Sequence, residues 1–186
     1  MLHSRTKRMV GIALLSAIVI VLQLMGSFIR FGPVSVSLVL IPIVVGAAMY
    51  GPTAGAILGA AFSVVVLFQP DTAFFYGISF VGTVLTVLVK GSLAGYLSGL
   101  TFLVLRNKHV WIAVILSSMV CPLVNTGLFA VGCRLFFWPS LEELGNGSPW
   151  MFLITGMIGF NFIAEFAVNM ICSPVILRIL RAAQHN

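Results

Sequence analysis

The sequence predicts an all-α membrane protein, a bundle of six transmembrane helices forming a single domain over residues 1–186. Hydrophobic residues make up 60% of the chain and charged residues only 8%, whereas soluble domains carry about 25% charged residues. A surface with so few charges would not stay dispersed in water, so most of it is expected to face lipid. Long apolar runs alternate with short breaks that contain Gly, Pro or charged residues, as expected of successive spans.

The first span is expected at residues 9–29, directly after a basic N-terminal stretch. A helix of this length covers roughly 31 Å, enough to cross the hydrocarbon core. A secretory signal could begin in the same way, but no small-residue cleavage site follows, so a retained helix is favoured.

The second and third spans are expected at residues 34–49 and 53–68, joined by a tight turn at Tyr50-Gly51-Pro52. Each is only roughly 24 Å long as a helix. The pair could therefore be a re-entrant hairpin. Two thin spans are favoured because burial in the bundle or local thinning of the bilayer tolerates short helices.

The last three spans are expected at residues 81–105, 110–136 and 151–177. An aromatic connection, residues 72–80, precedes the fourth helix, and a short polar loop, residues 106–109, follows it. A longer polar loop, residues 138–150, separates the fifth helix from the sixth.

The distribution of Lys and Arg predicts the orientation. With six helices, the N-terminus, the loop after the fourth helix and the C-terminus share one side. That side carries seven basic residues, namely Arg5, Lys7, Arg8, Arg106, Lys108, Arg178 and Arg181. The other side carries only Arg30 and Arg134. Because cytoplasmic loops are rich in Lys and Arg, both termini are expected in the cytoplasm.

Four polar residues inside the apolar segments are the candidate binding residues: Lys90, Asn125, Asn161 and Glu165. Counting from the outer helix ends places the first three about 13 to 16 Å deep, and Glu165 one turn deeper on the face of Asn161. A cation, two amides and a carboxylate at one level could hold a small polar molecule. Alternatively they bond one another as contacts between helices, or the lysine pairs with the glutamate or snorkels.

Phe75 and Tyr76, in the aromatic connection, are candidates for a lid over this site. Their flat rings and hydroxyl lie beside Gly77, which gives the segment conformational freedom. An interfacial aromatic belt explains the same residues equally well.

Several absences limit the function. The sequence has no phosphate-binding loop, no zinc-protease motif, no paired-acid metal site and no plausible Ser-His-Asp set. The chain is therefore expected to be no enzyme and to need no cofactor or metal. The basic residues separate apolar runs instead of forming a patch, which argues against nucleic-acid binding.

Small residues recur four positions apart in several helices. Gly51, Gly55 and Gly59 form one such series, and residues 91, 95 and 99 form another. Both glycine series are expected to pack helices closely inside the bundle. Ala13 and Ala17 repeat the pattern in the first helix, where spacing alone does not choose between internal packing and a partner protein.

The stretch 37–59 contains S-x-x-L-I-P-I followed by Y-G-P-T-A-G-A-I-L-G, and with residues 161–177 it resembles the substrate-binding subunits of energy-coupling factor transporters. The resemblance covers essentially the whole chain. It implies a small six-helix bacterial protein that binds a vitamin from outside and docks on a membrane coupling subunit with two ATPase subunits. Toppling in the membrane then releases the vitamin inside. The pair Ala13 and Ala17 matches the docking motif of this family.

The resemblance also implies a site built from the outer loops and the last three helices. A single intramembrane lysine favours an anionic ligand, and the amides could bond an amide or hydroxyls. Pantothenate carries all these groups, and the stretch 122–129 resembles the pantothenate-type members. Folate is the next candidate, with Phe75 and Tyr76 stacking on its rings; riboflavin and hydroxymethylpyrimidine need no cation.

Two functions of other classes stay open at this point. One is a membrane enzyme acting on a lipid or an isoprenoid, but the sequence lacks the acid–base or metal-binding residues that such an enzyme needs. The other is a structural or assembly protein without a small ligand.

Overall fold

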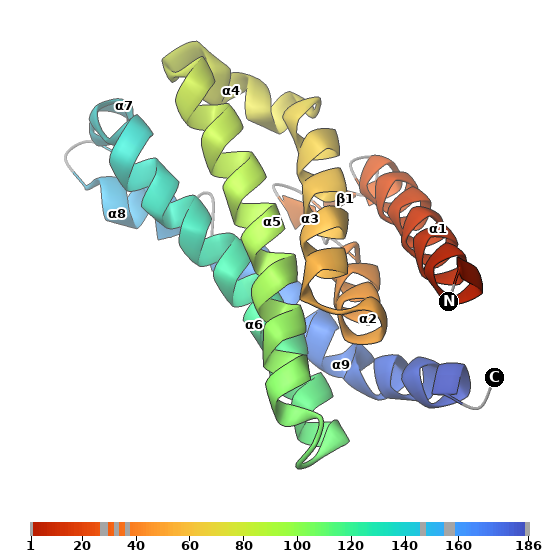
Figure 1. Ribbon diagram of the computed structural model, residues 1–186. Helices are drawn as coiled ribbons and strands as arrows, with labels where there is room; N and C mark the ends of the chain where they lie inside the picture. The colour runs from red at the N-terminus through yellow and green to blue at the C-terminus, as the bar shows by residue number, and fades with distance from the viewer. Residues whose placement is uncertain are drawn as a thin grey trace.

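The computed structural model describes residues 2–26, 30–31, 34–35, 38–145, 148–154 and 159–184. Figure 1 shows a bundle of long helices, with shorter helices gathered at one end. Four described helical segments are long and apolar enough to cross a membrane, or five if the bent pair α3 and α4 is one span. The all-α membrane fold is thereby confirmed. The sixth apolar segment, α2, is shorter than a span.

Helix α1, Leu2–Gly26, begins earlier than the expected residue 9, and residues 27–29 lie outside the described part. Strands β1, Arg30–Phe31, and β2, Val34–Ser35, then pair antiparallel. The predicted helix start at residue 34 is therefore wrong. Alternating Val and Ser in this stretch favour an extended backbone, because β-branched side chains fit strands better than helices.

Helix α2, Leu40–Tyr50, has only 11 residues, roughly 16 Å. It contacts α1, α3, α5, α6 and α9, and Leu40, Ile43 and Val44 on it are fully buried. The apolar core is thus centred on this short helix. Its burial within the bundle explains how an almost wholly apolar segment can be too short to cross the bilayer by itself.

Helix α3, Pro52–Leu67, begins after Gly51, whose φ of 92° makes the sharp turn from α2. Only glycine adopts this conformation without strain, and the fixed φ of Pro52 suits the first helical position. Helix α4, Pro70–Ile78, follows at an angle of 80°. The predicted connection 72–80 is therefore helical up to residue 78. Pro70 at the start and Asp71 in the first turn favour this helix.

Helix α5, Phe80–Leu105, starts at Ser79, whose Oγ accepts a hydrogen bond from the backbone N–H of Gly82 at 3.2 Å. Helix α6, Val110–Gly132, continues through a π-helical turn, η1, Cys133–Phe137, into α7, Trp138–Leu144. The predicted loop at 138–150 is wrong for its first half, which is α7. Helix α8, Pro149–Phe152, precedes α9, Gly159–Gln184, so the last long helix begins at 159 instead of 151.

Two glycines of each series pack α3 against α5, as expected, whereas Gly51 makes the turn before α3, where an added Cβ would meet nothing within 4 Å. A Cβ on Gly55 would collide with the carbonyl oxygen of Gly95, and a Cβ on Gly59 with that of Gly91. Side chains at these positions would force the two backbones apart. The backbones of α3 and α5 are therefore in close contact, and neighbouring helices pack against this pair.

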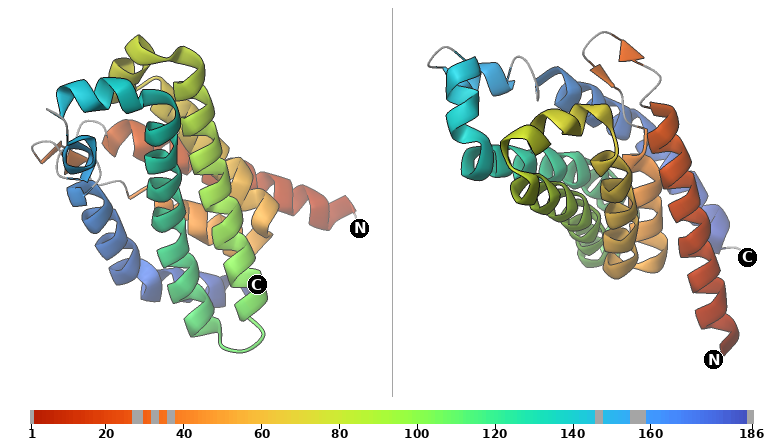
Figure 2. Two further views of the ribbon diagram at one scale, coloured as in Figure 1. Left: turned by 90° about the vertical axis from the view of Figure 1, so that its left-hand side faces the viewer. Right: turned by 90° about the horizontal axis from the view of Figure 1, so that it is seen from above.

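The start of α1, the α5–α6 turn and the end of α9 lie away from the end that carries α4, α7 and α8 (Figures 1 and 2). Arg8 donates to the carbonyl of Tyr50 at 2.8 Å and to Thr53 Oγ1 at 3.2 Å, joining the start of α1 to the α2–α3 turn. We call this part of the bundle the basic end. It gathers the three basic stretches that the sequence analysis grouped, while the assignment of this end to the cytoplasm stays a prediction.

Candidate functional site

Lys90 lies in α5, and its side chain is partly buried within the bundle. Its Nζ atom is 4.8 Å from the centroid of the Phe129 ring of α6. This is a cation–π contact, which stabilises a charge where water is scarce. Phe129 follows Asn125 by one helical turn on α6, so the two side chains share a face of that helix.

Glu165 of α9 is buried and close enough to Lys90 for the opposite charges to interact. Within the described part of the chain, no direct salt bridge joins them. Asn169, one turn further along α9, is fully buried and donates from Nδ2 to the backbone carbonyl of Glu165 at 2.9 Å. The charges of Lys90 and Glu165 therefore interact across two helices without forming a direct ion pair, so neither is fully neutralised by the other.

Three buried oxygen atoms among the described residues have no hydrogen-bond partner: Thr86 Oγ1, Asn125 Oδ1 and Asn169 Oδ1. One comes from each of α5, α6 and α9, the helices that carry Lys90, Phe129 and Glu165. A buried polar group without a partner costs roughly 1–3 kcal/mol. An occupant that donates hydrogen bonds would remove part of this cost, as expected for a site that awaits a polar ligand.

Phe75 of α4 connects the short outer helix to this region. Its ring lies 5.5 Å from Phe129 and 5.0 Å from Phe137, both in edge-on arrangements. Phe137 belongs to a buried cluster with Cys133, Leu141 and Leu153. The aromatic contact to Phe129 places Phe75 one side chain away from Lys90.

Tyr76 points elsewhere. Its hydroxyl donates to the carbonyl of Leu67 at 2.9 Å, and its ring stacks on Phe80 with a centroid distance of 5.4 Å. These contacts fasten α4 to the end of α3 and the start of α5. The structure does not bring Tyr76 together with Lys90, and its contact with a ligand stays a prediction.

Asn161 lies in the first turns of α9, but its side chain is outside what the structure describes. Helix geometry puts it on the face of Glu165, one turn earlier. Of the other predicted site residues, the structure brings Lys90 and Phe75 against Phe129 and puts Glu165 within range of the Lys90 charge, while Asn125 lies on the helix of Phe129.

Sequence reasoning missed Thr86 and Phe129. Each lies one helical turn from a predicted residue, Thr86 before Lys90 and Phe129 after Asn125. The signal available was this four-residue spacing, which puts a neighbour on the same helix face. No group of three or more potential metal-ligating His, Cys, Asp or Glu side chains occurs among the described residues.

Ala13 and Ala17 are both exposed on α1. Much of the surrounding helix surface is also apolar and exposed, with Met9 71% and Leu14 64% accessible. This surface is available either to lipid or to another membrane protein. Docking of a coupling subunit there stays a prediction.

Comparison with known proteins identifies the family. The family model described as "ECF transporter, substrate-specific component" matches residues 7–177, nearly the whole chain. No match was found among curated proteins or among solved structures. The chain therefore belongs to the substrate-specific components of ECF transporters, multi-pass membrane subunits that bind a substrate, pair with a coupling module and have no catalytic activity of their own.

Proposed function

We propose that this subunit binds an anionic vitamin between α5, α6 and α9, and that pantothenate is its substrate. The observation that carries the proposal is Lys90, a cation held on the Phe129 ring with unpaired buried oxygens on the same three helices. A carboxylate ligand in direct contact would neutralise the lysine more fully than Glu165 does, because Glu165 makes no salt bridge with it. The hydroxyls and the amide N–H of pantothenate would donate to the oxygens of Thr86, Asn125 and Asn169.

Folate is the second candidate. Its carboxylates could also use Lys90, and Phe75 offers a ring at the outer edge of the site for stacking. Folate also carries several N–H donors that could satisfy buried acceptors, but its two carboxylates would face a single lysine. Pantothenate is favoured because its one carboxylate matches the one cation of the proposed site.

After binding, the proposed cycle follows the family expectation. The loaded subunit docks through the Ala13 and Ala17 face of α1 on a membrane coupling subunit, which carries two ATPase subunits. Toppling in the membrane then exposes the vitamin to the cytoplasm. The two alanines are suited to such docking because they are exposed and allow close backbone approach.

Isothermal titration of the purified full chain with pantothenate tests the proposal. Sub-micromolar binding is expected, with a large loss in Lys90→Met, a variant that keeps the side-chain length without the charge. Lys108→Met is the matched control, because Lys108 is exposed in the α5–α6 turn. Tight folate binding without pantothenate binding would reassign the substrate. Equal affinity in wild type and Lys90→Met would remove the lysine from the site.

A further inference from the structure

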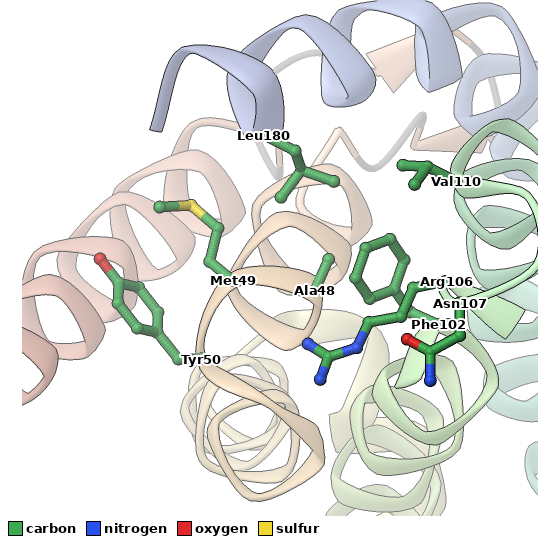
Figure 3. A pocket seen from close by; sticks show the side chains of 8 residues that line it. All are labelled: Ala48, Met49, Tyr50, Phe102, Arg106, Asn107, Val110 and Leu180. Atoms are coloured by element: carbon green, nitrogen blue, oxygen red, sulfur yellow. The ribbon is translucent and has the colours of Figure 1, made fainter. Parts of the chain in front are cut away.

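A cavity lies at the basic end of the bundle, beside the α5–α6 turn (Figure 3). Its volume is about 560 Å³. The α2 end, the α5–α6 turn and the last part of α9 enclose it. The lining residues are Ala48, Met49, Tyr50, Phe102, Arg106, Asn107, Val110 and Leu180.

The lining is divided into a polar and an apolar part. Arg106 and Asn107 supply a guanidinium and an amide on one side (Figure 3), while Phe102, Val110 and Leu180 supply apolar wall. Within the described part of the chain, the Arg106 guanidinium has no hydrogen-bond or ion-pair partner. A cation beside an apolar wall suits a ligand with an anionic head and a hydrocarbon tail.

The charge around this cavity is of one sign. The four acidic residues of the chain are Asp71, Glu142, Glu143 and Glu165. None of them lies at the basic end, because they belong to α4, α7 and the first third of α9. The positive charge of the basic end therefore has no Asp or Glu side chain to balance it, which favours an anion from outside the chain.

The position relative to the bilayer fits a lipid. The Arg181 guanidinium lies 5.5 Å from the centroid of the Trp111 ring, and Trp111 is 49% exposed on α6. Tryptophan is enriched at the level of the lipid headgroups. Trp111 directly follows Val110, so the lining of the cavity reaches that level.

We propose that this cavity binds an anionic phospholipid, with the phosphate on Arg106 and part of an acyl chain against Phe102, Val110 and Leu180. Basic pockets between transmembrane helices commonly bind such headgroups. The proposal is independent of which vitamin the subunit carries. A lipid seated there would link the α2–α3 turn, the α5–α6 turn and α9, and would anchor the basic end at the membrane surface.

Native mass spectrometry of the full chain in detergent, with phosphatidylglycerol or phosphatidylcholine added, tests the inference. Phosphatidylglycerol is expected to be retained about fivefold better than phosphatidylcholine, because one basic residue at a membrane surface strengthens binding to an anionic lipid by about that factor. Arg106→Gln is expected to lose this preference. Lys108→Gln is the matched control, since Lys108 lies in the same turn but outside the cavity lining, and it should keep the preference.

Three results would overturn the inference. Equal retention of the two lipids by the wild-type chain would show that no anionic headgroup is selected, whatever the behaviour of the variants. An equal loss in Lys108→Gln and Arg106→Gln would show a diffuse field instead of a site. Displacement of the lipid by inorganic phosphate or glycerol 3-phosphate at equimolar concentration would assign the cavity to a free phosphate compound.

Discussion

The Nζ atom of Lys90 lies 4.8 Å from the centroid of the Phe129 ring, so an aromatic face from α6 holds the lysine of α5. The same ring contacts Phe75 of α4 at 5.5 Å. Phe129 therefore connects the cation of the proposed site to the outer helix that could cover it.

Phe129→Leu is expected to weaken vitamin binding about fivefold, because a cation–π contact contributes about 1 kcal/mol. Calorimetric titration against wild type measures the effect. Phe68→Leu is the matched control: Phe68 is 85% exposed at the end of α3, and its replacement should leave the affinity unchanged. An unaltered affinity in Phe129→Leu would mean that the ring does not position the lysine.

Thr86→Val is expected to leave the ligand-free protein as stable as wild type or more stable. The reason is that the Oγ1 atom of Thr86 is buried without a partner, so the replacement removes a desolvation cost of roughly 1–3 kcal/mol. The same replacement should reduce the rise in melting temperature on adding the vitamin. Thermal unfolding in detergent, with and without ligand, measures both effects.

Thr83→Val is the control for this prediction, because the Oγ1 atom of Thr83 donates to the carbonyl of Ser79 at 2.7 Å. It should lower the stability of the ligand-free protein by about 1 kcal/mol and keep the full ligand effect. A loss of ligand-free stability in Thr86→Val would show that the hydroxyl has a partner, such as a bound water.

Several helix ends were predictable because they carry strong local signals. The Gly51-Pro52 turn fixes the start of α3, and the polar break at 106–109 fixes the end of α5 and the start of α6, each to within about a residue. Helices α4 and α7 were missed because at nine and seven residues they are too short to show a clear period. Their aromatic and polar composition is equally typical of interfacial loops.

The site was predictable only in part. The expected depths of Lys90 and Asn125 rest on the rise per residue and stay a prediction, while the structure puts their helices side by side. Phe129 could not be chosen over the other apolar side chains of α6, because its contact with Lys90 depends on how α5 and α6 are rotated against each other. The orientation of Tyr76 could not be predicted from the sequence either, because it depends on the hydrogen bond that its hydroxyl donates to the carbonyl of Leu67.

Gly59→Ala is expected to destabilise the protein by about 1–3 kcal/mol, the usual cost of overpacking. A Cβ at this position would collide with the backbone carbonyl of Gly91, which cannot rotate away. Gly127→Ala is the control, since a Cβ on Gly127 would meet nothing within 4 Å, and alanine favours a helix over glycine. Thermal unfolding should therefore show a lower melting temperature for Gly59→Ala and an unchanged or higher one for Gly127→Ala. An unchanged melting temperature in Gly59→Ala would mean that α3 and α5 can move apart without loss of stability.

Ala17→Trp is expected to abolish vitamin uptake into cells while leaving the affinity of the purified subunit unchanged, and Ala13→Trp should do the same. Both alanines are exposed on α1, so a bulky side chain there leaves the fold intact but keeps a partner helix away. Uptake of labelled vitamin with the coupling module present, beside calorimetric titration of the isolated subunit, separates the two effects.

Ile18→Trp provides the comparison that makes this prediction specific. Ile18 is exposed on the same helix but points about a third of a turn away from the two alanines. Uptake should survive in Ile18→Trp if docking uses the alanine face. Equal loss of uptake in all three variants would indicate a general disturbance of α1 in the membrane. Loss of vitamin affinity in Ala17→Trp would show that the alanines support the fold instead of docking.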